Sequence, residues 1–340
     1  MIATQLIMAR PICLIGEDEM TDYGIYYREE IKNDSDWART PNFDVFLSAF
    51  NHSERVLTVY EQVKATRKLW LIHAEYGIQM ADLPQEPRFE TEALDESTYC
   101  KELLTFLEEH AGFDPAVTSL CIDITGVVRP HLLFLTRLLH LKGVKRFYAI
   151  YAEPIQYTRK EKTVFSSGAI HEVRPIHGFG GSRETETSSD YLIIGMGYDD
   201  RMMAEVAEDR AKAEKHQLFG LPSLQADMYQ QSVIRSRKAA DEMGDPEFSV
   251  NNRSFAPAND PFGTADVLAE TVSKRRANGI VTNLYLSPLG TKAQALGFAL
   301  YFIHDCLDSR SATILYPFSH SYEAETSSGL ARAWLYTVEF

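Results

Sequence analysis

Short apolar runs alternate with longer amphipathic stretches along most of the chain. The apolar runs are rich in β-branched and aromatic residues, as at 43–50 and 191–197, and this content is typical of buried strands. The amphipathic stretches repeat their apolar positions every three or four residues, as helices do. Strands that alternate with helices in this way, and that read as nearly continuous apolar runs, predict a doubly wound and mostly parallel α/β sheet.

The clearest single unit begins with the strand at 43–50. Residues 54–67 then show helical spacing, and a second apolar strand follows at 68–73. The length of this βαβ unit predicts two parallel strands joined by a right-handed crossover. A polar loop and an amphipathic helix come next, so we predict that a smaller N-terminal α/β unit covers residues 1–114.

The remainder of the chain repeats the alternation at greater length. We therefore predict that residues 115–340 form a Rossmann-like α/β domain with a β insert near 160–180. No role is predicted for two polar segments, 17–41 and 182–189. The predicted strands lie at 119–124, 146–152, 191–197, 216–221, 280–286, 312–317 and 331–340, and the predicted helices at 130–141, 199–215, 227–243, 263–277 and 291–305.

Composition narrows the possible partners. The chain has 340 residues, 45% hydrophobic content and a net charge of −14. This allows one or two packed domains and argues against a broad nucleic-acid surface, because phosphate neutralisation needs clustered Lys and Arg. No apolar run approaches the ~18 residues of a membrane span. The four cysteines are scattered, with Cys121 and Cys306 in apolar runs, so we expect reduced, buried thiols and a cytoplasmic location.

The candidate chemistry lies in turns that follow strands, because open α/β sheets bind ligands outside the carboxyl ends of their strands. One such turn runs from Asp123 to Arg129. We predict that Asp123 accepts a hydrogen bond from a ribose hydroxyl. Thr125, the Gly126 N–H and Arg129 are predicted to hold a phosphate, with Arg129 donating two hydrogen bonds. The alternative is that Asp123 caps the turn while Arg129 pairs with a surface carboxylate.

A second turn, Gly290-Thr291-Lys292, opens the predicted helix at 291–305. Backbone N–H groups, a hydroxyl and an ammonium there meet the positive end of a helix dipole, which favours an anion. Gln294 faces the same helix end and is predicted to contact a base or a ribose. The alternative is a polar helix start that binds nothing. The glycine spacing of a Walker loop is missing, so ATP hydrolysis is not implied.

Other motifs are absent or ambiguous. The histidines and cysteines show no paired metal-ligand spacing, so no metal site is predicted, and no cofactor is identified. No nucleophile elbow is present. The turns at 195–201 and 316–322 also follow strands. We interpret the first as an ordinary turn, whereas the second fits a loop over a ligand and a plain surface loop equally well.

The strand from Asn283 into Gly290-Thr291-Lys292 resembles the ligand-binding turn of CARF-type (CRISPR-associated Rossmann-fold) sensors. Thr125-Gly126 is similar to an early turn of that family that carries a small or hydroxyl residue. The resemblance implies that residues 115–340 form a Rossmann-like module that binds a nucleotide second messenger. The sequence departs from the family at Pro288-Leu289, where such turns favour glycine, and by its β insert.

Residues 43–48 and the helix start after them resemble the opening of TIR (Toll/interleukin-1 receptor-like) domains. In the members of that family that cleave NAD, a later glutamate is catalytic. The resemblance makes Glu75, which follows the strand at 68–73, a candidate catalytic residue. A plain βαβ unit explains the same pattern.

Together these patterns predict a cytoplasmic Rossmann-like protein that binds a nucleotide or related anion and acts as a sensor or accessory subunit in bacterial defence. The first alternative is an enzyme that acts on a nucleotide or its glycosidic bond, as an NAD hydrolase does, with Glu75 or Asp123 as the acidic group. The second is a structural partner in a larger complex or homo-oligomer, for which the acidic surface and polar insertions serve as docking sites. No membrane contact is expected.

Overall fold

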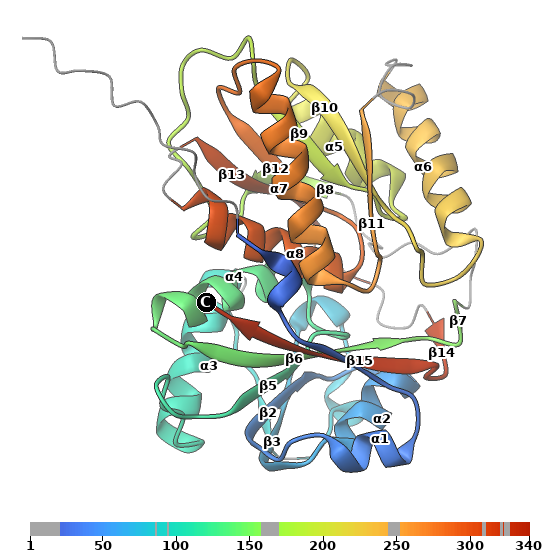
Figure 1. Ribbon diagram of the computed structural model, residues 1–340. Helices are drawn as coiled ribbons and strands as arrows, with labels where there is room; N and C mark the ends of the chain where they lie inside the picture. The colour runs from blue at the N-terminus through green and yellow to red at the C-terminus, as the bar shows by residue number, and fades with distance from the viewer. Residues whose placement is uncertain are drawn as a thin grey trace, which may run out of the picture.

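Two α/β lobes, each built on its own mixed and mostly parallel sheet, make up the protein. The computed structural model describes residues 21–85, 87–93, 95–157, 170–243, 252–307, 311–319, 322 and 327–340. Figure 1 shows the lobes stacked, with the seven-stranded sheet of the first lobe below and the six-stranded sheet of the second lobe above. The predicted Rossmann-like α/β class is therefore confirmed.

In the first lobe the strands β6, β5, β2, β3 and β4 run parallel, and β15 runs antiparallel between β6 and β1. Because β2 and β3 pair in parallel and α2 connects them, the predicted βαβ unit is confirmed. In sheet order the strands are β1 (Arg28–Ile31), β15 (Arg332–Glu339), β6 (Arg146–Glu153), β5 (Leu120–Asp123), β2 (Phe43–Ala49), β3 (Ala65–Leu71) and β4 (Arg88–Phe89), and the α-helices are α1 (Asp34–Arg39), α2 (Glu54–Gln62), α3 (Glu96–His110) and α4 (Arg129–Leu141).

In the second lobe the strands β11, β10, β9, β12 and β13 run parallel, and β8 pairs antiparallel with β13 at the edge. None of the described helices combines the length and the apolar character needed to cross a bilayer. In sheet order the strands are β11 (Arg253–Ala256), β10 (Glu214–Gly220), β9 (Tyr191–Gly195), β12 (Leu284–Pro288), β13 (Ala312–Ser319) and β8 (Ile170–Pro175), and the α-helices are α5 (Asp200–Asp209), α6 (Met228–Met243), α7 (Pro261–Ala277) and α8 (Lys292–Tyr301).

The division between the two sheets differs from the predicted boundary at residue 115. β5 and β6 belong to the first sheet, where β5 pairs with β2, and the C-terminal strand β15 returns to pair with β6. The first sheet therefore takes strands from residues 28–153 and 332–339, and the second from residues 170–319. The predicted boundary was wrong because an apolar strand carries no local mark of the sheet that it joins, and long-range pairing decides it.

The structure describes parts of the predicted β insert and of the two polar segments for which no role was predicted. Of the predicted β insert near 160–180, β8 is an edge strand, while residues 158–169 lie outside the described part of the chain. The described part of the polar segment at 17–41 supplies β1 and buries Ile31 and Trp37. The segment at 182–189 contains neither helix nor strand.

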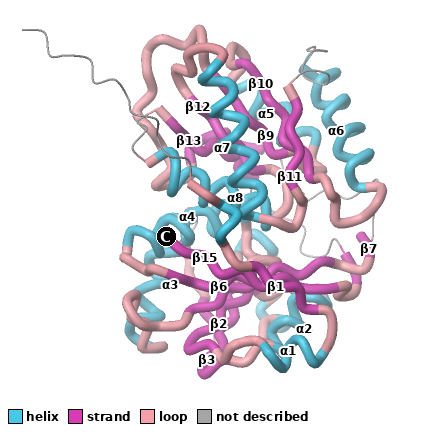
Figure 2. The backbone as a smooth tube through the Cα atoms, viewed as in Figure 1, coloured by secondary structure: helices cyan, strands magenta, loops and turns pink. Residues whose placement is uncertain are grey.

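One apolar core runs through both lobes. Its buried residues include Leu47 and Leu133 from the first lobe and Ile193 and Leu286 from the second. Helices α4 and α8 pack against each other between the sheets, as Figure 2 shows. The two lobes therefore bury apolar surface against each other as well as within themselves, which favours a fixed arrangement.

An ion-pair network also joins α3 of the first lobe to the start of the second. The Arg174 guanidinium donates to both oxygens of Glu96 at 2.9 Å, and the N–H and ring Nδ1 of His177 lie 3.1 and 2.8 Å from the same carboxylate. Glu96 is 1% exposed. Burial alone raises the pKa of Glu96, but the hydrogen bonds from Arg174 and His177 outweigh it and lower the pKa to about 2.

Replacing Glu96 by glutamine should lower the free energy of unfolding at neutral pH by about 2 kcal/mol, because charge-assisted hydrogen bonds are lost. The pKa of Glu96 is lower in the folded than in the unfolded state. Its contribution is therefore present above the unfolded value of 4.5 and is lost as the pH falls towards 2. Scanning calorimetry over this pH range should show a loss of stability in the wild type that Glu96→Gln lacks.

The matched control is Glu109→Gln, an exposed glutamate on the same helix. It should behave as the wild type does. If Glu96→Gln and the wild type lose stability equally between pH 4.5 and 2, the network does not hold the lobes as described.

Candidate ligand-binding cleft

The carboxyl ends of the parallel strands in both sheets border one cleft between the lobes. Its lining includes Thr125, which follows β5, and Gly197 and Gly290, which follow β9 and β12. The cleft opens to solvent, and the space that the centre of a water-sized sphere can occupy in it is about 90 Å³. Strand ends of α/β sheets and junctions between lobes are both preferred places for ligands.

The structure brings the two predicted turns together across this cleft. Six of the eight predicted site residues line it, namely Thr125, Arg129, Gly290, Thr291, Lys292 and Gln294. Arg129 Nε and Nη2 donate to the Gly290 carbonyl at 3.0 and 2.6 Å. In the opposite direction, Lys292 Nζ donates to the Val127 carbonyl. Each lobe therefore sends a cation to the backbone of the other lobe's turn, a relation that residues 161 apart in sequence do not reveal.

Positive charge gathers in this cleft although the chain as a whole is acidic, with a net charge of −14. Arg55, Arg129 and Lys292 all line it, and none of the described residues that line it is Asp or Glu. Burial, and then the neighbouring guanidinium groups of Arg129 and Arg55, hold the pKa of Lys292 well below its usual value. Because like charges have converged there, an anion in the cleft would relieve their repulsion.

Two of the predicted site residues, Thr291 and Gln294, form hydrogen bonds with each other at the start of α8. Thr291 Oγ1 accepts from the Gln294 N–H at 3.1 Å, and Gln294 Oε1 accepts from the Thr291 N–H at 3.3 Å. This is a capping box, in which both side chains complete the first turn of the helix. Thr291 and Gln294 therefore act as the polar helix start that was the alternative interpretation. The Lys292 side chain takes no part in the capping box and lines the cleft.

The helices α2 and α4 begin differently. Their N-cap residues, Ser53 and Val128, line the cleft and accept no side-chain hydrogen bond from the first turn. The buried Ser53 Oγ has no hydrogen-bond partner among the described atoms. Two helix N-termini without side-chain caps add their partial positive charge to that of the three cations.

Asp123 has a different role from the predicted contact with a ribose. Its carboxylate is 0% exposed and accepts from Ser48 Oγ and from the Thr125 N–H, each at 2.9 Å. Burial raises the pKa of Asp123. Asp123 is the last residue of β5 and lies opposite Ser48 of β2, and both of its carboxylate oxygens accept hydrogen bonds from within the protein. It caps the turn, which was the alternative interpretation.

Gly126 lies where the same turn packs closely against the end of β2. A Cβ atom at this position would lie 2.6 Å from the Ala49 carbonyl oxygen, so only glycine lets the turn approach β2 this closely. The Gly126 carbonyl accepts a hydrogen bond from the Tyr76 hydroxyl. Since Gly126 does not line the cleft, its predicted phosphate contact is replaced by packing.

Sequence analysis missed the contribution of the first turn of α2. Asn51, Ser53 and Arg55 all line the cleft and follow β2. A hint of this contribution was the parallel pairing of β2 and β5, because the carboxyl ends of these neighbouring strands meet at one edge of the sheet. The predicted domain boundary placed these two strands in different units, so their shared edge was not expected. Four tyrosines line the cleft as well, namely Tyr76, Tyr151, Tyr198 and Tyr322.

The candidate catalytic residue Glu75 lies next to the cleft but does not line it. It belongs to the short helix η2 (Ala74–Tyr76), whose last residue, Tyr76, does line the cleft. The Glu75 carboxylate lies 3.7 Å from Nε2 of His131. The two candidate acids, Glu75 and Asp123, therefore both lie behind the cleft wall.

Replacing Gly197 by alanine should lower the free energy of unfolding by about 2 kcal/mol, because the added Cβ would overpack a closely packed turn. That atom would lie 2.1 Å from the Leu289 carbonyl oxygen across the cleft edge. At Gly180 an added Cβ would make only ordinary contact, 3.7 Å from Pro175 Cβ, so Gly180→Ala is the matched control. Urea unfolding of both variants tests this, and equal midpoints would show that the turn relaxes freely.

Comparisons with known proteins assign no family. No protein-family model matches the chain, and no curated protein matches it in sequence. Among solved structures, one match is described as "Adenylation, ketoreductase, and pseudo Asub multidomain structure of a keto acid-selecting NRPS module", at 10% identity and a TM-score of 0.20. The match covers 85% of this chain and 34% of that chain, so this chain spans about a third of its length. A likeness at this level carries no inference about fold or function.

Proposed function

We propose that the cleft between the lobes binds a nucleotide or a related anionic ligand, and that the protein acts as a sensor or accessory subunit. The single observation that carries the proposal is the charge of the cleft. Arg55, Arg129 and Lys292 converge there, and within the described part of the chain no acidic residue lines the cleft. An anion with several charged oxygens suits this arrangement better than any neutral or cationic ligand.

The rest of the lining supports a nucleotide rather than a simple inorganic anion. Tyr151 and Tyr198 are among the aromatic residues that line the cleft, and an aromatic ring is a surface against which a base can stack. The turns at Thr125 and at Gly290 are also the two that resemble CARF-type sensors, and both reach this cleft. A role in bacterial defence is part of the same proposal.

Because the ligand would touch both lobes, its binding would be sensitive to their arrangement. Arg129 belongs to the first lobe and Lys292 to the second, yet each donates to the backbone of the other. A ligand that competes for these cations would alter the junction between the lobes, and a partner protein could respond to that change. The buried thiols of Cys100, Cys121 and Cys306 favour a cytoplasmic location for such a sensor.

The first test is to identify what the cleft binds. Purified protein is denatured and its released small molecules are identified by mass spectrometry, and the folded protein is then titrated with AMP, ATP, NAD, cyclic dinucleotides and inorganic phosphate. A nucleotide that binds should raise the stability by about 2.7 kcal/mol at a hundred times its Kd. This is measured as a rise in Tm. If neither nucleotide nor phosphate changes the Tm, the cleft is not an anion site.

The second test locates the binding. Arg55→Met and Lys292→Met keep the bulk of each side chain and remove its charge, so each should weaken nucleotide binding about tenfold, since a charge-assisted hydrogen bond is lost. Lys274→Met is the control, because Lys274 is exposed on α7 and pairs with Glu270 there. Calorimetric titration measures all three variants. Unchanged affinity in both cleft variants would place the ligand elsewhere.

The same protein samples separate binding from catalysis. An enzyme that cleaves a glycosidic bond needs an acidic group at its ligand, and the lining residues that the structure describes supply none. We therefore expect NAD to remain intact during incubation with the wild type. Consumption of NAD that disappears in Glu75→Gln but persists in Lys274→Met would favour the enzyme instead.

A further inference from the structure

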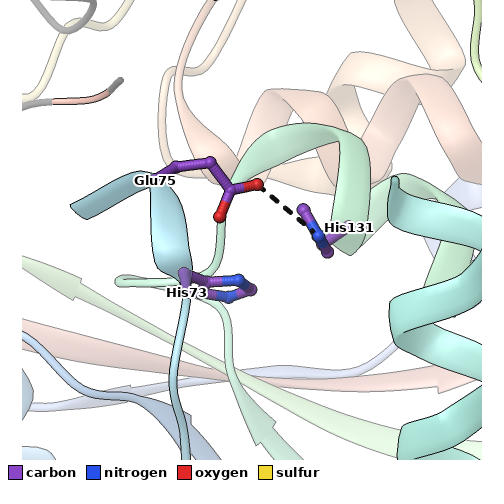
Figure 3. Close-up of side chains that lie close together, drawn as sticks. All are labelled: His73, Glu75 and His131. Atoms are coloured by element: carbon purple, nitrogen blue, oxygen red, sulfur yellow. Dashed lines mark ion pairs between the residues drawn. The ribbon is translucent and has the colours of Figure 1, made fainter. Parts of the chain in front are cut away.

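Two histidines and a glutamate meet beside the cleft, outside the set of residues that carries the proposed anion site. His73 directly precedes η2, Glu75 lies within η2, and His131 lies in the first turn of α4. Figure 3 shows the three side chains around one shared space. One potential ligand atom from each residue lies within 4.8 Å of the others, so small side-chain movements would bring all three within the bond lengths of a single ion.

Three ring nitrogens of the two buried histidines lack a hydrogen-bond partner within the described protein atoms. His73 is 2% exposed and His131 is 5% exposed. Both ring nitrogens of His73 and the Nδ1 atom of His131 have no partner among the described atoms. A buried polar atom without a partner costs about 1–3 kcal/mol, and three such atoms in two adjacent rings indicate that something else binds these nitrogens.

Packing already holds both rings in place. The ring of Tyr99 stacks on His73 with 5.1 Å between centroids and meets His131 edge-on at 4.7 Å. The Tyr99 hydroxyl donates to the Ile72 carbonyl, next to His73. The imidazoles are therefore oriented before any ion arrives, which reduces the entropy lost on binding.

The side-chain types of the cluster suit a divalent metal ion. Imidazole is the commonest protein ligand of transition metals, and His73 and His131 supply two such rings. Glu75 adds a carboxylate that is 23% exposed, and its pairing with His131 at 3.7 Å is too long for a hydrogen bond. Lys292 is a nearby cation that opposes a metal here, and its Nζ donates to the Val127 carbonyl.

We propose that His73, Glu75 and His131 bind a divalent transition-metal ion. Two imidazoles and one carboxylate are a ligand set that Zn²⁺, Co²⁺ and Fe²⁺ accept, with further positions left for water or a ligand. Mg²⁺ and Ca²⁺ prefer oxygen ligands and fit this set poorly. Tyr76 and Arg129, close in the chain to Glu75 and His131, line the cleft, so the metal site lies beside the cleft wall.

A second group of two carboxylates and a histidine differs, because its carboxylates have hydrogen-bond partners within the protein. Asp95, Glu96 and His177 also have ligand atoms within reach of one another. There, however, Arg174 and His177 occupy the carboxylate of Glu96, and Asp95 caps α3 by accepting from two backbone N–H groups. Nothing in that group lacks a partner, so it needs no ion. The contrast supports the assignment to His73, Glu75 and His131.

The test uses the full chain, freed of metal by dialysis against a chelator and kept without nucleotide. Co²⁺ is titrated while the visible absorption of the ion is recorded, and Zn²⁺ binding is measured by calorimetry and by displacement of Co²⁺. We expect one ion per chain, with the absorption that imidazole ligands give to Co²⁺. His73→Ala and Glu75→Gln should each weaken binding by more than about tenfold, since even residues that only orient a metal ligand contribute about 10–100-fold.

The controls separate a lost site from a lost fold. Glu75 is partly exposed, so Glu75→Gln should keep the circular dichroism spectrum and Tm of the metal-free wild type even if His73→Ala does not. His110→Ala removes an exposed histidine at the end of α3 and should leave binding unchanged. If the wild type shows no Co²⁺ absorption, or if folded Glu75→Gln binds as tightly as the wild type, the proposal is overturned. Neither result depends on whether the cleft binds an anion.

Discussion

The arrangement of this protein depends on a reciprocal exchange of hydrogen bonds across the junction of its lobes. Arg129 of the first lobe donates twice to the Gly290 carbonyl of the second, and Lys292 of the second lobe donates to the Val127 carbonyl of the first. Carbonyl oxygens can accept from a cation without neutralising it. The two basic side chains therefore meet where the two turns meet.

That exchange explains how an acidic chain contains a cationic cleft. A buried or partly buried cation is normally balanced by a carboxylate, because the loss of hydration is otherwise uncompensated. At Arg129 and Lys292 backbone carbonyl groups accept hydrogen bonds from the cations, and the carboxylate of Glu75, which acts on Lys292, lies outside the lining. The continuous apolar core beneath, with α4 packed on α8, keeps the cations close despite their repulsion.

The strand ends divide their polar residues into two layers. Facing the cleft are residues such as Thr125 and Arg129, which a ligand can reach. Behind them lie Asp123, which fixes the turn, and the cluster with His73 and His131, whose nitrogens lack partners. The residues that face the cleft thus form a surface for ligand recognition. The buried residues behind them are better suited to a metal ion than to a solvated anion.

The sequence by itself determined the α/β class, the βαβ unit around α2 and the two turns at Asp123 and Gly290, because apolar periodicity and turn composition are local properties. It did not determine which sheet β5 joins, that Asp123 faces Ser48, or that Arg55 lines the cleft. Those outcomes follow from pairings between distant segments, for which a single sequence carries no local signal. The same reason hid the cluster of His73, Glu75 and His131, since a metal site is recognised from sequence only when its ligands keep a regular spacing. Here tertiary structure alone brings them together, by placing η2 against the first turn of α4.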